Sequence, residues 1–140
     1  MNYSFFQRPS RYINSEYNSA GPKNLSGAVK FALAFPDVYE IGMSHLGLRI
    51  LYKIINDLPY AYAERVFSPW TDLEEHMRKN SVPLTSLESH TPLIEFDIAG
   101  FSIQYELAYT TVLNMLHLSG MPVRSEERLS SKKRFPLVVA

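Results

Sequence analysis

The hydrophobic pattern of residues 30–58 constrains the fold more than any other feature of the sequence. "KFALAF" (Lys30–Phe35) is a nearly unbroken apolar run, which is typical of a strand buried on both faces of a parallel sheet. A Pro-Asp step and a Gly-Met-Ser-His-Leu-Gly turn follow, and the apolar residues then recur at three- and four-residue steps. This change of period predicts a helix over Ser44–Leu58 with Ser44 as its N-cap. The predicted buried stripe of the helix consists of Leu46, Ile50, Leu51, Ile54, Ile55 and Leu58.

The remainder of the chain continues the alternation of strands and helices. Further strands are predicted at Ala63–Phe67, Pro83–Ser89, Phe96–Gln104 and Phe135–Ala140, the second of these at a sheet edge. A second helix begins near Thr71, where Thr71 and Glu74 form a capping-box pattern, and buries Leu73 and Met77. A third helix spans Leu107–Ser119; its buried stripe is Ala108, Val112, Met115 and Leu116, and Gly120 closes it. Alternation of this kind predicts an α/β fold of Rossmann-like or flavodoxin-like type, with a mainly parallel sheet flanked by helices.

The sequence divides into an arm and one domain. Residues 1–29 are polar and broken by Pro and Gly, so we expect an irregular N-terminal arm, strapped to the domain by Tyr12, Ile13 and Tyr17. Residues 30–140 form the α/β domain. The last predicted strand has no helix after it to cover it, and we therefore expect a sheet truncated at its C-terminal end and a chain that is a fragment of a longer protein.

Composition argues against several classes of function. The net charge is zero, so neither a nucleic-acid partner nor an anionic membrane is supported, and the basic residues Arg128 and Lys132–Arg134 are interpreted as a solvated loop. The chain contains no cysteine and therefore cannot build a thiolate metal site or an iron–sulfur ligand set. It has no bilayer-length apolar run and no signal-peptide pattern, so the expected location is the cytoplasm.

The first candidate site lies in the turn after the first strand, because ligands of open α/β sheets gather beyond the carboxyl ends of the strands. Gly42, Ser44, His45 and Gly47 are the residues concerned. The glycines and the free amides at the helix start could hold an anion, but no dinucleotide or P-loop motif is present, and a tight strand-to-helix turn is the alternative. His45 could contact a cofactor, or it could simply shape the turn.

The second candidate site follows the strand that ends near Ser102. Ser102, Gln104 and Tyr105 form a dense polar set that could hydrogen-bond a ligand rich in amides or hydroxyls. The alternative is that these residues cap the next helix. The predicted cofactor-binding residues are therefore Gly42, Ser44, His45, Gly47, Ser102, Gln104 and Tyr105, and no catalytic residue or metal site is predicted.

Five segments together resemble a known family. They are "RPSRYINSEYNS", "FALAFPDVYEIGMSHLGLRILY", "AERVFSPWTDLEEHMR", "PLTSLES" and "FDIAGFSIQYELAYTTVLNML". The chain from about Arg8 to Ala140 is similar to the N-terminal part of a family of B12-binding-domain-type radical SAM proteins. The resemblance implies a cobalamin-binding-like domain followed by a radical SAM barrel, whose CxxxCxxC motif holds a [4Fe–4S] cluster and which binds S-adenosylmethionine. Without cysteine in this chain, that chemistry is expected only in the downstream barrel.

The usual cobalamin signature of such domains, Asp-x-His-x-x-Gly, is absent. Asp37 and His45 are too far apart, and Leu48 stands where the signature needs glycine. Some radical SAM relatives hold cobalamin without a histidine below the cobalt, so the resemblance still implies cobalamin as a cofactor to be tested.

Two functions follow from these observations. The first is an accessory domain that covers a radical SAM barrel and holds a corrinoid over its centre. The second is a non-catalytic docking domain, which would bind its own barrel or another protein at the unfinished sheet edge and would self-associate through that edge. A free-standing flavodoxin-like binder is a third alternative, and it requires a complete sheet.

Overall fold

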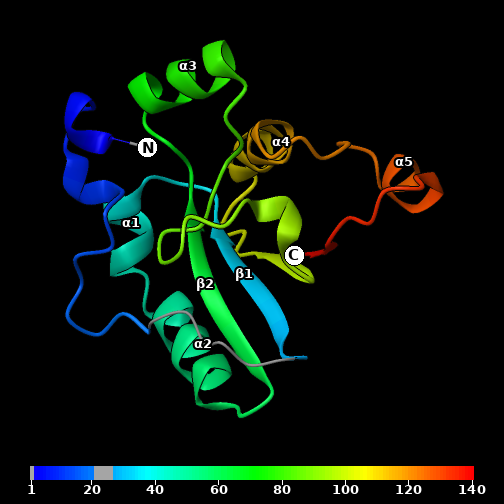
Figure 1. Ribbon diagram of the computed structural model, residues 1–140. Coiled ribbons are helices and arrows are strands. Elements are labelled where there is room, and N and C mark those ends of the chain that lie inside the picture. Colours follow the sequence, from blue (N-terminus) through cyan, green and yellow to red (C-terminus); the bar gives the residue numbers. More distant parts are fainter. Residues whose placement is uncertain (1, 21–26) are drawn as a thin grey trace.

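The centre of the protein is a four-stranded sheet whose neighbouring strands all run parallel (Figure 1). The computed structural model describes residues 2–20 and 27–140. The strands are β1 (Val29–Phe35), β2 (Ala61–Phe67), β3 (Ile98–Phe101) and β4 (Leu137–Val139). Their order across the sheet is β2-β1-β3-β4, so the chain first adds a strand on one side of β1 and then two on the other. The predicted α/β class with a parallel sheet is confirmed.

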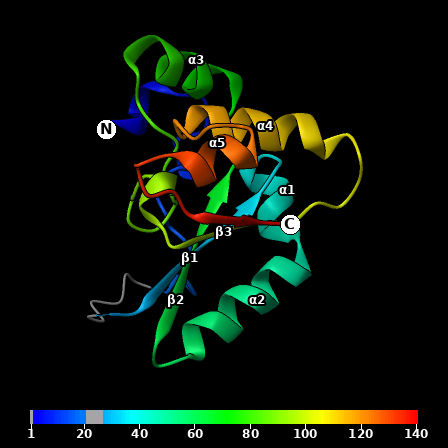
Figure 2. The same cartoon turned by 90° about the vertical axis from the view of Figure 1, so that its right-hand side faces the viewer.

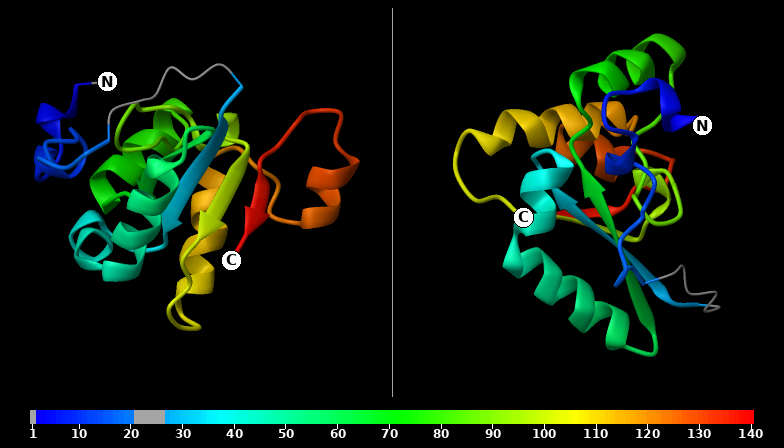
Figure 3. Two further views of the ribbon diagram at one scale, coloured as in Figure 1. Left: turned by 90° about the horizontal axis from the view of Figure 1, so that it is seen from below. Right: turned by 90° about the vertical axis from the view of Figure 1, so that its left-hand side faces the viewer.

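Helices pack on both faces of the sheet (Figure 3). The α-helices are α1 (Tyr39–Ser44), α2 (Leu46–Asp57), α3 (Thr71–Asn80), α4 (Ala108–Leu118) and α5 (Ser125–Ser130). Short 3-10 turns occur at η1 (Tyr3–Phe5), η2 (Pro9–Arg11) and η3 (Leu93–Glu95). None of the helices in the described ranges is long and apolar enough to cross a membrane.

Strand β1 contributes to two separate cores because successive side chains leave opposite faces of a strand. On one face, Leu33 and Phe35 pack with Leu48 and Tyr52 of α2. On the other face, Ala32 and Ala34 join a larger core. That core also holds Leu73 and Met77 of α3 and the predicted α4 residues Val112, Met115 and Leu116. The predicted buried residues of α3 and α4 are confirmed, and Gly120 ends the α4 region with a positive φ of 70°.

The predicted helix Ser44–Leu58 is divided in two. Ser44 is the last residue of α1 and its Oγ donates to the carbonyl of Ile41 (2.8 Å), so it is not an N-cap. His45 caps α2 instead, because its Nδ1 accepts a hydrogen bond from the Leu48 N–H (3.1 Å). A ring nitrogen that accepts a backbone N–H satisfies one of the orphan donors of the helix start.

The apolar stripe predicted for this helix is largely wrong in its register, although its member Ile55 packs on the core. Leu48 and Tyr52 face the sheet, whereas Leu46, Ile50 and Ile54 are 66%, 49% and 54% exposed. The helix carries apolar residues around most of its circumference, and two registers therefore satisfy helical spacing. The predicted stripe lacks Tyr52, whose ring can be buried while its hydroxyl group forms hydrogen bonds away from the core.

The strand predicted at Pro83–Ser89 does not form. The segment does lie along the outer edge of β2, where the Leu87 N–H donates to the Arg65 carbonyl (2.8 Å). At the next position a strand would offer a backbone carbonyl as acceptor. Here the Arg65 N–H donates instead to the Glu88 carboxylate (2.8 Å). The sequence therefore correctly placed this segment at the edge of the sheet, but the substitution of a carboxylate for a backbone carbonyl could not be read from it.

The last strand and its approach also differ from expectation. A strand forms within the predicted range and pairs with β3, but Leu137 and Val139 are 62% and 44% exposed, so the strand is not buried on both faces as predicted, and of its three residues only Val138 packs on the larger core. The predicted polar loop before it contains α5, none of whose residues is buried. Helix α3 begins after Trp70 without a side-chain cap, so the Thr71–Glu74 capping box is also absent.

Of the three residues predicted to hold the N-terminal arm on the domain, one does so. Tyr12 does bind the domain, since its hydroxyl accepts the Trp70 N–H (3.3 Å). Ile13 and Tyr17 are exposed. Among the described residues of the arm, Arg11 has a buried side chain, which forms an ion pair with Glu40 of α1 (2.9 Å).

We expect replacement of Glu88 by alanine to destabilise the fold strongly. The Arg65 Nε–Glu88 Oε1 pair (2.6 Å) is buried, with 6% and 0% of the two side chains exposed. Removing one partner leaves a buried charge uncompensated, so the free energy of unfolding should fall by about 3–5 kcal/mol. Urea denaturation measures this. Asp57→Ala, in the exposed pair Lys53–Asp57, should cost no more than about 0.5 kcal/mol, and equal losses would contradict the expectation.

Gly42→Ala should also destabilise the domain. A Cβ at Gly42 would lie 2.5 Å from Phe67 Cδ1 and 3.3 Å from Phe35 Cδ1, and both rings are buried. Overpacking of this kind costs about 1–3 kcal/mol. In Gly100→Ala the new methyl would meet its nearest neighbour, Val139 Cγ2, at 3.7 Å, so this control should be neutral or stabilising by up to about 1 kcal/mol. Thermal denaturation of both variants measures these changes. A Gly42→Ala variant as stable as the wild type would refute the packing role of this glycine.

Candidate functional site

The topology of the sheet places its switch point between β1 and β3. The connection from β1 runs through α1 and α2 over one face, and the connection from β3 runs through α4 over the other. The carboxyl ends of the two strands are adjacent, and the Ser102 N–H donates to the Ala34 carbonyl (3.0 Å). The junction of α1 with α2, the loop after β3 and the end of β4 lie at the same side of the molecule (Figure 2).

The first group of predicted site residues lies at the junction of α1 and α2. Gly42 is buried against the rings of Phe35 and Phe67. Ser44 is exposed and bonds the turn before it, and Gly47 is half-buried beside the His45 ring. These contacts explain the small residues of the turn by packing and capping.

The side chain of His45 already makes its contacts within the protein. Its ring lies 5.0 Å from that of Phe35, and its Nδ1 accepts the Leu48 N–H. In the neutral ring the Nε2 atom must then carry the proton, so it has no lone pair for a metal. In this geometry His45 does not fit the role of a cobalt ligand, and the alternative that it shapes the turn accounts for its contacts.

The second group of predicted residues extends beyond β3. Ser102 is half-buried, whereas Gln104 and Tyr105 are exposed. Helix α4 has Leu107 as its N-cap and no side-chain capping bond, so the capping alternative for these residues is not observed. They remain a polar set directly beyond the switch point, where a ligand of the predicted kind would meet them.

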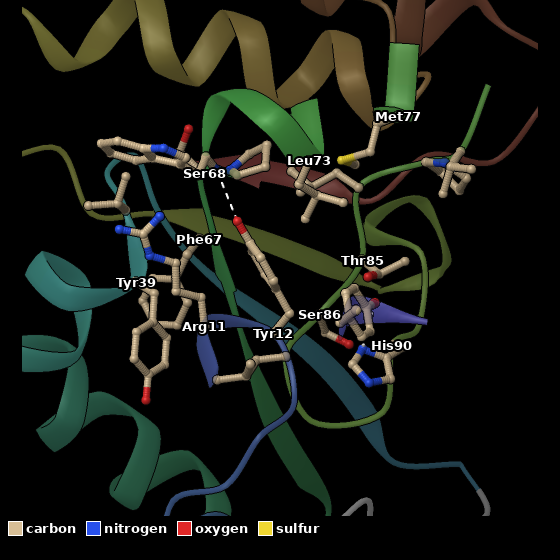
Figure 4. A pocket seen from close by; sticks show the side chains of 18 residues that line it. Arg11, Tyr12, Tyr39, Phe67, Ser68, Leu73, Met77, Thr85, Ser86 and His90 are labelled. Atoms are coloured by element: carbon tan, nitrogen blue, oxygen red, sulfur yellow. Dashed lines mark hydrogen bonds between the residues drawn. The ribbon is translucent and has the colours of Figure 1, made fainter. Parts of the chain in front are cut away.

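A well-formed cavity lies elsewhere. It has a volume of about 190 Å³ and lies between the N-terminal arm, the end of β2, α3 and the loop 82–90 (Figure 4). None of the seven predicted residues lines it. Its polar lining includes Arg11, Tyr12 and Thr85, and Trp70 lies at the side of Arg11, with the guanidinium carbon 4.4 Å from the ring centroid.

Two buried charges next to this cavity were missed by the sequence analysis. Glu64 accepts hydrogen bonds from the hydroxyls of Ser86 (2.5 Å) and Ser89 (2.6 Å). Arg65 pairs with Glu88, and desolvation raises the pKa of the Glu88 carboxyl although the guanidinium opposes this shift. The consecutive charges in a buried strand, within "AERVF", were the available signal, since charged residues are almost never buried without partners.

Arg65 also ties the N-terminal arm to the sheet. Its Nη2 lies 3.5 Å from Glu16 Oε2, and Tyr39 donates its hydroxyl to the other Glu16 oxygen. Burial, and then the hydrogen bond to Glu16, raise the pKa of Tyr39 to about 12. The guanidinium carbon of Arg65 stands 4.6 Å from the ring centroid of Tyr52, which in turn accepts the Ala20 N–H. This arrangement positions the arm, and within the described ranges no cluster of three or more His, Asp or Glu could hold a metal ion.

Comparison with protein families gives a match over most of the chain. The model described as radical SAM proteins, N-terminal, matches residues 47–140. Comparisons with curated proteins and with solved structures find no match. The match confirms the radical SAM part of the predicted resemblance, whereas its B12-binding type stays a prediction. The chain therefore belongs to the radical SAM proteins, of which it is an N-terminal accessory domain.

Proposed function

We propose that this domain docks onto the radical SAM portion of its protein through β3 and β4. The surface concerned is on the side of the sheet that carries α2, where α2 does not extend over these two strands. The observation that carries the proposal is the apolar surface left on β4. Leu137 and Val139 both leave the strand on the side away from the larger core, into which Val138 points. Both side chains are largely exposed, although a strand of a parallel sheet is ordinarily covered on both faces.

The exposed surface continues onto β3. Ile98 pairs with Leu137, and Gly100 pairs with Val139, so these four residues share one face. We call them the β3–β4 strip. Helix α2 packs on β1 and β2, and α5 stands away from the sheet (Figure 3). A partner element on the strip would bury the apolar side chains, and burial contributes about 25 cal/mol for each Å² removed from water.

The outer edge of β4 supports the same proposal. In the described chain no strand pairs on that side, so backbone donors and acceptors are available for a further strand. The radical SAM portion is the occupant that fits the family, because an N-terminal domain precedes it in the same protein. The iron–sulfur cluster and S-adenosylmethionine would belong to that portion, since this chain has no cysteine.

Hydrogen exchange tests the docking proposal. The β4 amides should exchange at least tenfold more slowly in the longer radical SAM protein than in the 140-residue chain. The double variant Leu137→Asp, Val139→Asp should abolish that difference, because it places two charges in the interface. Leu129→Asp, on the exposed face of α5, is the matched control and should retain it. Equal exchange of β4 in the two proteins would contradict the proposal.

A second candidate function is cobalamin binding at the switch point. The polar residues Ser102, Gln104 and Tyr105 beyond β3 favour it, since this is where open α/β sheets bind ligands. His45 does not fit as a ligand from below, so the corrin would be held by contacts around its rim with no protein bond to cobalt.

Absorbance tests cobalamin binding. After incubation with hydroxocobalamin and desalting, we expect the chain to retain visible absorbance with an unshifted cobalt spectrum. His45→Ala should retain the colour, whereas Gln104→Ala with Tyr105→Ala should lose most of it. A colourless wild-type protein would remove this second candidate and would leave the docking proposal standing.

A further inference from the structure

The cavity beneath the N-terminal arm is built from segments that are far apart in the sequence. Tyr3, Arg11 and Tyr12 come from the arm, and Leu73 and Met77 come from α3 (Figure 4). The end of β2 and the loop 82–90 complete the walls. With about 190 Å³, the cavity is smaller than the roughly 300–1,000 Å³ of pockets for drug-sized ligands, so its occupant must be a smaller molecule.

The walls of the cavity are mostly apolar. The aliphatic and aromatic residues that line it include Val38, Phe67, Leu73, Met77, Leu84 and Leu87. All of these except Val38 are buried. A ligand must therefore present an apolar body to this surface, because apolar walls give no hydrogen bonds to a polar one.

Arg11 lines this cavity and carries an unfulfilled hydrogen-bond donor beside it. The residue is only 7% exposed, its Nε donates to Glu40 Oε1 (2.9 Å), and its guanidinium lies over the Trp70 ring. Its Nη1 is buried without a hydrogen-bond partner among the described residues. A buried donor left in this state costs free energy, of which an acceptor inside the cavity would restore a part.

Tyr12 adds a second donor near Arg11. Its hydroxyl oxygen accepts the Trp70 N–H, so its own proton is free to point into the cavity. Figure 4 shows Tyr12 standing between Arg11 on one side and Thr85 on the other. Burial raises the pKa of this hydroxyl, and the Arg11 guanidinium opposes the shift in part.

We propose that this cavity binds a small organic acid, with its apolar body against α3 and the loop 82–90 and its carboxylate on the Tyr12 hydroxyl and on Arg11 Nη1, which a small turn of the buried guanidinium would present to the cavity. Arginine is suited to this because its planar donors match a carboxylate. The ligand would bridge the arm and the domain, so its binding would hold the arm in place. This site is separate from the β3–β4 strip and from the residues beyond β3.

Phenylacetate is a suitable probe, and the neutral phenylacetamide is its isosteric control. Trp70 is the single tryptophan of the chain and lines the cavity, so its fluorescence reports binding directly. We expect saturable quenching of the full 140-residue chain by phenylacetate and at least tenfold weaker binding of the amide. Absence of saturable quenching, or equal affinity for acid and amide, would overturn the proposal.

Variants locate the site on Arg11 and Tyr12. Arg11→Gln should weaken phenylacetate binding at least tenfold, and Tyr12→Phe should weaken it about threefold. Arg8→Gln is the matched control, because Arg8 also pairs with Glu40 (3.0 Å) but is exposed and does not line the cavity; it should bind within twofold of wild type. If Arg11→Gln fails to fold, the acid-to-amide ratio of Tyr12→Phe decides: a ratio unchanged from wild type refutes the assignment, and a lower ratio supports it.

Discussion

The buried charges of the edge strand β2 hold the other parts of the molecule in register. Glu64 and Arg65 are consecutive, so their side chains leave opposite faces of the strand. Glu64 receives the hydroxyls of Ser86 and Ser89, while Arg65 pairs with Glu88 from the same loop. One short loop is therefore fixed from both faces of the sheet by two neighbouring residues. Apolar contacts could not specify this placement so narrowly, because they are not directional.

The guanidinium of Arg65 also determines where the N-terminal arm lies. Arg65 reaches Glu16 and stands against the Tyr52 ring, so the arm, the loop 82–90 and α2 share one buried cation. A buried charge is tolerated only when it is paired, and an unpaired one is strongly destabilising. These segments must then assemble together, although they are separated by tens of residues in the sequence. The buried ion pair adds specificity of arrangement here more than it adds net stability.

Period and breaker residues predicted β1, β2, β3, β4, α3 and α4, because each of these elements has apolar residues that match the period of its type and breaker residues near its ends. They failed where a side chain performs a backbone function. His45 replaces a conventional cap, and the Glu88 carboxylate replaces a strand carbonyl at the edge of β2. For the candidate site, the sequence located the switch point through the order of strands. It could not locate the cavity, since Arg11, Trp70 and Thr85 meet only through tertiary folding.

The two proposed binding sites lie at opposite edges of the sheet and suit different ligands. The cavity adjoins β2 and the β3–β4 strip lies on the other outer strand, so the order β2-β1-β3-β4 sets them at opposite edges. The strip is open and apolar, which suits a large partner surface, whereas the cavity is enclosed and has buried donors, which suits a small acid. A partner on β4 would leave the cavity untouched, because the cavity is closed by the arm. An effect of one site on the other would therefore have to pass through β1, whose two faces contribute to both cores.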